Sequence, residues 1–121
     1  MNLREMKIAV VGSGAVGCYY GGMLAHAGCD VRFLMRADLA AVRERGLTIH
    51  TQGKTVAVPR VTACATTAEI GPVDFVIIAL KATANAALET LLPPLLGANT
   101  ALLTLQNGLG NEEFQIGRAH V

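Results

Sequence analysis

The spacing of hydrophobic and polar residues predicts alternating strands and helices along most of the chain. Four short runs rich in aliphatic and β-branched residues predict buried strands, at residues 7–11, 31–35, 73–80 and 100–105. Two longer segments with apolar residues at helical spacing predict helices, over residues 15–27 and 84–96. Gly28 ends the first helix, and Pro93 and Pro94 break the second one near its end.

Shorter signals lie between these elements. Asp38 is a candidate N-cap for a helix that runs to about Arg45 and is closed by Gly46. Two alternating segments predict a hairpin, at residues 47–50 and 54–58, with the turn at 51–53. Thr66 and Glu69 have the spacing of a capping box and predict one helical turn. Strands that alternate with helices in this way predict an α/β fold, in which helices cover both faces of a parallel sheet.

The composition fits one globular domain in a chain of 121 residues, 52% of them hydrophobic. Ten Lys and Arg against nine Asp and Glu give a net charge of +1, which argues against nucleic acid or an anionic membrane as a partner. Cys18, Cys29 and Cys64 match no zinc or redox spacing, and we expect no metal site. They are predicted to be small buried residues in the reducing cytoplasm.

The segment from residue 8 to residue 29 has no charged residue and superficially suggests a signal peptide. Five glycines between Gly12 and Gly22 argue against this, because each weakens a helix by ~1 kcal/mol relative to alanine. Ser13 and His26 also interrupt the apolar run. We therefore expect a cytoplasmic protein.

The last six residues, 116–121, carry no periodic pattern. They also equal the codon-by-codon translation of part of a widely used sequencing adapter. We expect an N-terminal Rossmann domain over residues 1–115, cut from a longer protein, followed by a non-native tail. The alternative is an ordinary frayed end.

A glycine-rich motif follows the first predicted strand and opens the first predicted helix. It comprises Gly12, Ser13, Gly14, Ala15, Val16 and Gly17. In a dinucleotide-binding site the first glycine permits the tight turn, the second lets a pyrophosphate approach the backbone, and the third lets helix and strand pack closely. Backbone N–H groups at the helix start would then meet the phosphates. The alternative is a glycine-rich turn that binds no ligand.

The end of the second predicted strand indicates which dinucleotide would bind. An NAD site usually has a carboxylate there, about 20 residues after the glycines, to hold the ribose 2′-hydroxyl. This chain has Arg36, whose guanidinium suits the 2′-phosphate of NADP. Asp38 is the competing residue, but it comes two residues later and is better placed as a helix cap. The alternative for Arg36 is a solvated surface charge.

Two polar residues follow the last two predicted strands. Lys81 comes after the most apolar strand, and Asn107 follows the final one. Ligands bind outside the carboxyl ends of strands in open α/β sheets, so both residues are predicted to face the cofactor crevice. A solvated strand end and an ordinary Asn-Gly turn are equally good interpretations from spacing alone. We interpret the three histidines, His26, His50 and His120, as non-functional.

Together, these segments resemble the ketopantoate reductase (2-dehydropantoate 2-reductase) family. The resemblance is carried by residues 12–17, Arg36, residues 80–82 and residues 106–112, and runs from about Met6 to Gln115. It implies a Rossmann-type doubly wound parallel sheet. It also implies NADPH-dependent reduction of 2-dehydropantoate, a small keto acid, to pantoate in pantothenate and coenzyme A biosynthesis.

The same resemblance implies roles for individual residues. The loop from Gly12 to Gly17 would bind the pyrophosphate of NADPH, and Arg36 its 2′-phosphate. Lys81 and Asn107 would lie near the nicotinamide ribose, and Asn107 would also touch the substrate. Family members continue into a helical C-terminal domain that holds the proton-donating lysine, so we expect no catalytic residue and no activity in this fragment.

Two other hypotheses stay open. A free-standing domain of this fold could be a nucleotide-sensing module with no chemistry of its own. The chain could also be the first domain of another NAD(P)-dependent dehydrogenase family.

Overall fold

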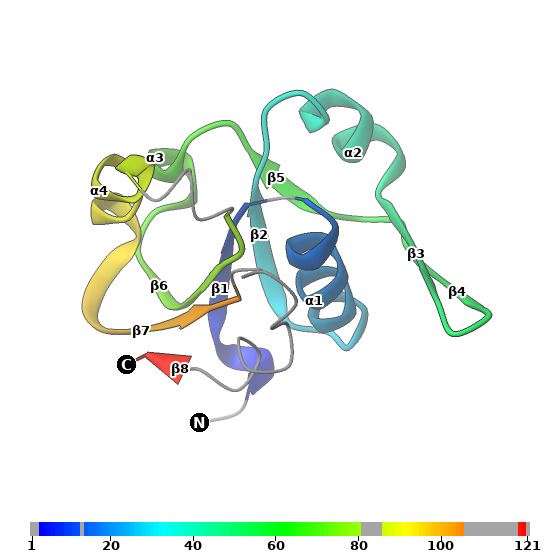
Figure 1. The fold of residues 1–121 in the computed structure, drawn as a ribbon, viewed down its shortest axis with the longest axis horizontal. Coiled ribbons are helices and arrows are strands. Elements are labelled where there is room, and N and C mark those ends of the chain that lie inside the picture. Colours follow the sequence, from blue (N-terminus) through cyan, green and yellow to red (C-terminus); the bar gives the residue numbers. More distant parts are fainter. Residues whose placement is uncertain (1–2, 13, 81–85, 106–118, 121) are drawn as a thin grey trace.

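A computed structural model describes residues 3–12, 14–80, 86–105 and 119–120 (Figure 1). Strands and helices alternate along the chain, except for the three consecutive strands β3, β4 and β5. The first half contains η1 (Leu3–Glu5), β1 (Lys7–Val11), α1 (Ala15–His26), β2 (Asp30–Leu34), α2 (Leu39–Arg45), β3 (Leu47–Thr51) and β4 (Lys54–Val58). The second half contains β5 (Thr62–Cys64), α3 (Thr67–Ile70), β6 (Val73–Ile78), α4 (Leu88–Leu91), η3 (Pro93–Leu95), β7 (Leu96–Thr104) and β8 (Ala119–His120).

The main sheet has the strand order β5-β2-β1-β6-β7-β8. Its first five strands are parallel, and β8 pairs antiparallel with β7. The chain moves outward from β1 through β2 to β5, then returns to the other side of β1 for β6 and β7. This reversal beside β1 is the topology of a Rossmann-like doubly wound sheet, which confirms the predicted fold class.

Each face of the sheet has its own hydrophobic core, because side chains alternate along β1. Ile8 and Val10 belong to the core on one face, and Ala9 and Val11 to the core on the other. On the first face, α1 supplies partly buried apolar residues. On the second face, Ile70 of α3 and Leu95 of η3 complete the core, so helices cover opposite faces as predicted (Figure 1).

Several predicted boundaries are wrong. β6 ends two residues early, and the predicted 84–96 helix is α-helical only over Leu88–Leu91 within its described part, with 3-10 geometry at residues 86–87. Pro93 and Pro94 then form a 3-10 turn, because proline cannot continue the hydrogen-bond ladder of an α-helix. Strand β5 was not predicted, since its three residues contain no run of β-branched residues. It exists because the edge of β2 provides hydrogen-bond partners.

The predicted hairpin is confirmed. β3 and β4 pair antiparallel from Leu47 with Val58 to Thr51 with Lys54. The turn between them is formed by Gln52 and Gly53, both with positive φ (46° and 74°). This left-handed pair is typical of a type I′ hairpin turn.

The predicted caps of α2 are only partly confirmed. Asp38 occupies the N-cap position, but its side chain makes no capping hydrogen bond. At the other end, Gly46 adopts a φ of 75° and its N–H donates to the Val42 carbonyl at 2.8 Å. The helix therefore ends as predicted, whereas the Asp38 carboxylate is not used as a cap.

The predicted capping box at α3 is present in a widened form. Thr66 Oγ1 accepts a hydrogen bond from the Glu69 N–H at 3.2 Å. Glu69 Oε1 in turn accepts from the Ala65 N–H, one residue before the expected partner.

Replacing Thr66 by Ala is expected to lower the free energy of unfolding by about 1 kcal/mol, whereas Thr66→Ser retains the cap. Urea unfolding of the two variants tests this, and equal stabilities would show that the hydroxyl contributes nothing.

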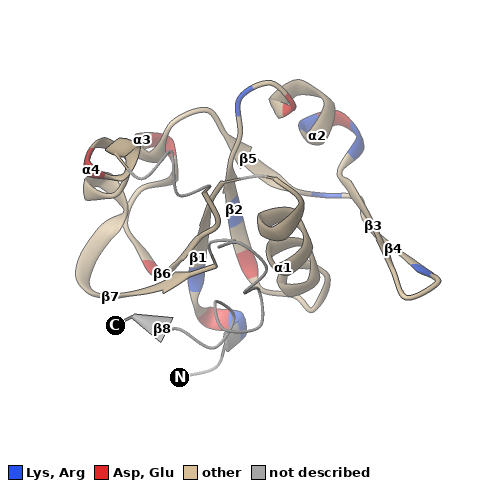
Figure 2. Cartoon of the chain, in the orientation of Figure 1, with Lys and Arg blue, Asp and Glu red and all other residues tan. Residues whose placement is uncertain are grey.

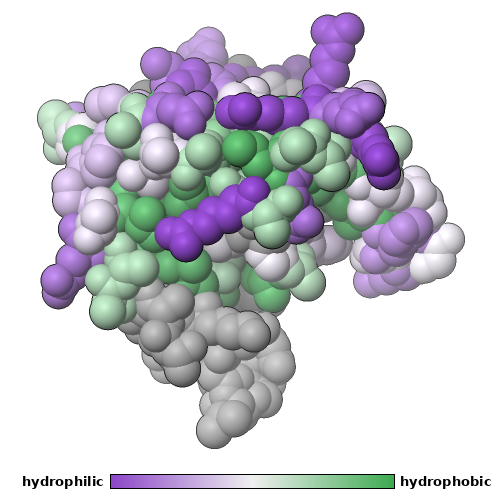
Figure 3. Space-filling view, turned by 90° about the horizontal axis from the view of Figure 1, so that it is seen from above, coloured by the Kyte–Doolittle hydropathy of each residue, from purple (hydrophilic) through white to green (hydrophobic). Residues whose placement is uncertain are grey.

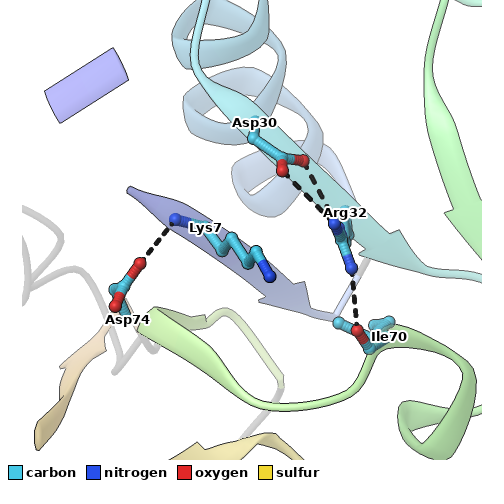
Figure 4. A network of polar contacts seen from close by, with 5 residues as sticks. All are labelled: Lys7, Asp30, Arg32, Ile70 and Asp74. Atoms are coloured by element: carbon cyan, nitrogen blue, oxygen red, sulfur yellow. Dashed lines mark hydrogen bonds and ion pairs between the residues drawn. The ribbon is translucent and has the colours of Figure 1, made fainter. Parts of the chain in front are cut away.

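Polar contacts also connect the strands to their neighbours (Figure 4). The Lys7 backbone N–H donates to the Asp74 carboxylate at 2.9 Å and connects the starts of β1 and β6. Arg32 of β2 pairs with Asp30 at 3.3 Å and donates to the Ile70 carbonyl at 3.0 Å. These charged residues hold the sheet and α3 together.

Candidate functional site

The carboxyl ends of the parallel strands lie level with one another. Val11 at the end of β1 is in register with Leu34 of β2 and with Ile78 of β6. The ladder continues past the strands, since Ala79 N–H donates to the Val11 carbonyl at 2.8 Å and Leu105 N–H donates to the Ile78 carbonyl at 2.7 Å. The glycine-rich loop after β1 therefore starts beside the end of β6, where the strand order reverses and open α/β sheets bind ligands.

Gly12 makes a sharp turn against the end of β6. Its φ is 103°, a conformation that favours glycine. A Cβ atom here would lie 2.6 Å from the Ala79 carbonyl carbon and 2.8 Å from the Leu80 nitrogen. The backbone of residues 79–80 is thus one wall of the site, and no sequence motif indicates this contact.

Gly17 seats the first turn of α1 on β1. A Cβ atom at this buried position would overlap the Gly12 carbonyl oxygen and approach Val10 Cγ1 at 3.2 Å. Only hydrogen fits between the helix and the loop. The start of α1 is therefore held directly against the sheet edge.

Gly14 has the opposite environment. It is exposed, it occupies the N-cap position of α1, and a Cβ atom built on it meets nothing within 4 Å. The first helical hydrogen bond runs from Cys18 N–H to the Gly14 carbonyl at 2.9 Å. The N–H groups of Ala15, Val16 and Gly17 precede it and have no partner within the helix. First-turn N–H groups that follow an exposed, uncrowded glycine suit an anion.

Arg36 lies at the same edge of the sheet. It follows buried Met35, whose N–H donates to the Cys64 carbonyl at 2.9 Å and extends the ladder beyond β2. The Arg36 side chain is exposed and forms no ion pair within the described part of the chain. Charged residues gather around α2 and the loop before it, whereas α1 carries none (Figure 2).

The Asp38 carboxylate lies near the first turns of α1. Burial raises the pKa of the Cys18 thiol, and the negative charge of Asp38 raises it further. Burial likewise raises the pKa of Cys64, with Glu69 adding to the effect. Raised pKa values favour the neutral thiol. Cys29 and Cys64 are buried as predicted, whereas Cys18 is only half-buried.

Three predicted site residues, Ser13, Lys81 and Asn107, lie outside the described residues. Lys81 follows β6 and Asn107 follows β7 in the sequence. Both strands end at the edge of the sheet where Gly12 lies. Seen from above, this edge of the molecule shows apolar residues with a long hydrophilic side chain lying across them, and further hydrophilic residues along the rim (Figure 3).

The histidines show no grouping at this edge. His26 ends α1, and His50 contacts Thr55 Oγ1 at 3.3 Å within the hairpin. In the described ranges, no three His, Cys, Asp or Glu side chains are grouped as metal ligands would be. No described helix is both long and apolar enough to cross a membrane.

Comparisons with known proteins agree with this geometry. The sequence profile of a family described as "Ketopantoate reductase PanE/ApbA" matches residues 8–118. A 2-dehydropantoate 2-reductase from Nostoc sp. PCC 7120 is 41% identical over 111 residues, which are 92% of this chain and 35% of the relative. A crystal structure of 2-dehydropantoate 2-reductase from Geobacter metallireducens has a TM-score of 0.81 at 46% identity and covers 88% of this chain.

A third similar structure is a D-mandelate dehydrogenase in a ternary complex with NADH and anilino(oxo)acetate. It has a TM-score of 0.73 at 31% identity and matches 89% of this chain and 35% of its own. The matched part of the Geobacter protein is 36% of its chain. The chain thus spans about a third of the length of each of these three proteins.

Proposed function

The chain belongs to the ketopantoate reductase PanE/ApbA family, and on that premise we propose that it forms the NADPH-binding part of a 2-dehydropantoate 2-reductase. The observation that carries this proposal is the glycine-rich loop at the reversal of strand order. There, Gly12 and Gly17 leave no room for a side chain, whereas Gly14 faces open space. A ligand that packs on the backbone at Gly14 accounts for this difference.

The residues at the loop fit the phosphates of NADPH. The N–H groups at the start of α1, together with the loop from Gly12 through Ser13 to Gly17, would hold the pyrophosphate without a cation. Arg36 would hold the 2′-phosphate by charge-assisted hydrogen bonds, for which its exposed guanidinium is available. Lys81 and Asn107, as the resemblance implies, would lie near the nicotinamide ribose.

The proposed reaction is reduction of a small keto acid, 2-dehydropantoate, to its hydroxy acid. When bound, NADPH supplies the hydride for the keto carbon. Asn107 would orient the substrate, and the proton for the developing alkoxide would come from the part of the protein that corresponds to the remaining length of the relatives. We place this reaction in pantothenate and coenzyme A biosynthesis, in the cytoplasm.

Cofactor preference tests the assignment of Arg36. The chain is expected to bind NADPH about 10- to 100-fold more tightly than NADH, because one charge-assisted hydrogen bond contributes ~1.5–3 kcal/mol. Arg36→Ala should remove most of this preference by weakening NADPH binding alone. Fluorescence titration with both nucleotides measures the two dissociation constants.

Arg45→Ala is the matched control, since Arg45 is also exposed but lies in the last turn of α2. It should leave the ratio of the two dissociation constants unchanged. Equal affinities of the unaltered chain for NADPH and NADH would contradict the assignment, as would an Arg36→Ala variant with the original ratio.

The similarity to D-mandelate dehydrogenase supports a second candidate, the nucleotide-binding part of an NAD-dependent 2-hydroxy-acid dehydrogenase. That protein's complex contains NADH, whereas Arg36 in this chain favours NADPH. A preference for NADH in the same titration would favour the second candidate.

A further inference from the structure

An apolar groove lies on the first face of the sheet, next to α1. Its floor contains Phe75 and Ile77 of β6, together with Leu103 of β7 and Leu105 just after it. The groove has a volume of about 260 Å³, and among the described residues no charged side chain lines it. Phe75 and Leu103 are only half-buried, whereas both faces of a strand inside a parallel sheet are normally covered. An apolar hollow left open in this way marks an interaction site.

The groove has a wall on one side only. That wall is α1, from which Tyr20 and Leu24 contribute half-buried side chains. The described residues that line the groove belong to β1, α1, β6 and the end of β7, so the side beyond β7 has no helix among them.

The path of the chain explains why this half of the face has no helix. Connections between parallel strands are right-handed. The chain moves one way from β1 to β2 and the opposite way from β6 to β7, so the two connecting helices lie on opposite faces. Accordingly, α1 packs against the first core, and Leu88 and Leu91 of α4 pack against the second. In the described part of the chain, both helices of the first face, α1 and α2, precede β3, and they leave β6 and β7 open.

The open space has the dimensions of one α-helix. Neighbouring strands lie about 4.8 Å apart, so β6 and β7 together extend the floor about 10 Å beyond β1, which is the diameter of a helix. Ala101 is level with Phe75, and the floor continues from there to Leu105, a length of about 13 Å or two to three helical turns. A helix with an apolar stripe on one face would fill this space.

We propose that the groove receives an amphipathic helix from the part of the complete protein that corresponds to the remaining length of the relatives. This chain matches 35% of the Nostoc relative and 36% of the Geobacter protein, so most of a protein of that length remains to supply the helix. A helix suits the groove because it pairs its own backbone groups and presents only apolar side chains to the charge-free lining. The inference rests on membership of the family and requires no bound nucleotide.

The test compares the 121-residue chain with a complete chain, in which the remaining part of the Nostoc reductase follows residue 115. The dye anilinonaphthalene sulfonate (ANS) fluoresces on exposed apolar surface. It should bind the 121-residue chain, and its signal with the complete chain should be at least about threefold lower, because the helix then covers the groove. Circular dichroism checks that both chains are folded.

Two neighbouring residues of α1 provide a matched pair of variants. Leu24→Lys puts a charge into the wall of the groove, whereas Met23 is also half-buried but does not line it. Leu24→Lys should reduce ANS binding to the 121-residue chain at least about twofold. It should also lower the Tm of the complete chain by at least about 4 °C more than that of the 121-residue chain, because the helix would bury the charge. Met23→Lys should leave ANS binding unchanged and shift both Tm values equally.

Several results would overturn the proposal. Equal ANS signals from the two chains would show that nothing in the complete chain covers the groove, and equal Tm shifts caused by Leu24→Lys would show the same. A dimer of the complete chain that Leu24→Lys dissociates would show that a second copy fills the groove instead. If the complete chain does not fold, the same two substitutions at the aligned positions of the Nostoc reductase repeat the Tm comparison. None of these measurements involves NADPH, so this inference and the proposed function can fail separately.

Discussion

Gly14→Val is expected to abolish NADPH binding while the fold remains intact. The backbone of Gly14 has an ordinary φ of −72°, and a Cβ atom there meets nothing within 4 Å, so valine fits the chain without strain. The branched side chain would occupy the space in front of the first-turn N–H groups of α1. Each charge-assisted hydrogen bond to a phosphate is worth ~1.5–3 kcal/mol, so losing two should weaken binding by at least about 100-fold. Calorimetric titration measures the binding, and circular dichroism with thermal unfolding monitors the fold.

Gly17→Ala is the matched contrast. Alanine is smaller than valine, but at this position it should lower the stability of the fold more than Gly14→Val does. Its Cβ atom would overlap the Gly12 carbonyl oxygen, so the loop or the helix must move. Overpacking of this kind costs ~1–3 kcal/mol, whereas alanine in an uncrowded helix would stabilise by ~1 kcal/mol. NADPH binding retained in Gly14→Val would show that the loop does not hold the phosphates. A Gly17→Ala variant of raised stability would show that the close contact does not exist.

The 121-residue chain by itself is expected to bind NADPH and to show no reductase activity. It spans about a third of the length of its relatives, and the resemblance implies that the proton donor lies in the rest. Positioning of the reactants can account for ~7–11 kcal/mol of a barrier, and general acid catalysis for roughly 10²- to 10⁴-fold in rate. Without both contributions, no turnover should exceed the enzyme-free rate when 2-dehydropantoate and NADPH are added and cofactor absorbance is followed.

The 2-dehydropantoate 2-reductase from Nostoc, assayed in parallel, provides the positive control for substrate and cofactor. Turnover by the 121-residue chain that disappears in Lys81→Ala would contradict the prediction. Lys81 would then be the catalytic acid of a minimal enzyme. The role proposed above for Lys81, near the nicotinamide ribose, includes no proton transfer.

Local signals in the sequence were sufficient for β1, for α1 and for the hairpin that packs against α1. β1 itself, α1 and the hairpin of β3 and β4 have the predicted bounds to within one residue. Their signals are local, since the apolar run, the helical spacing and the Gln52-Gly53 turn each depend on neighbouring residues. Elements that depend on distant partners were not predicted well. β5 is a strand because β2 lies beside it. The break at Pro93 and Pro94 was predicted, but the late start of the α-helix before it, at Leu88, was not.

The sequence by itself determined the fold class, the family and the candidate residues of the loop from Gly12 to Gly17. These follow from residue types at short, regular spacings, which depend little on the rest of the chain. The tertiary structure decided which groups meet at the site. The reversal of strand order at β1 sets Gly12 against the backbone of Ala79 and Leu80, and Asp38 begins α2 without a capping hydrogen bond from its side chain. Such contacts join residues far apart in the sequence, and their geometry exists only once the parallel strands are in register.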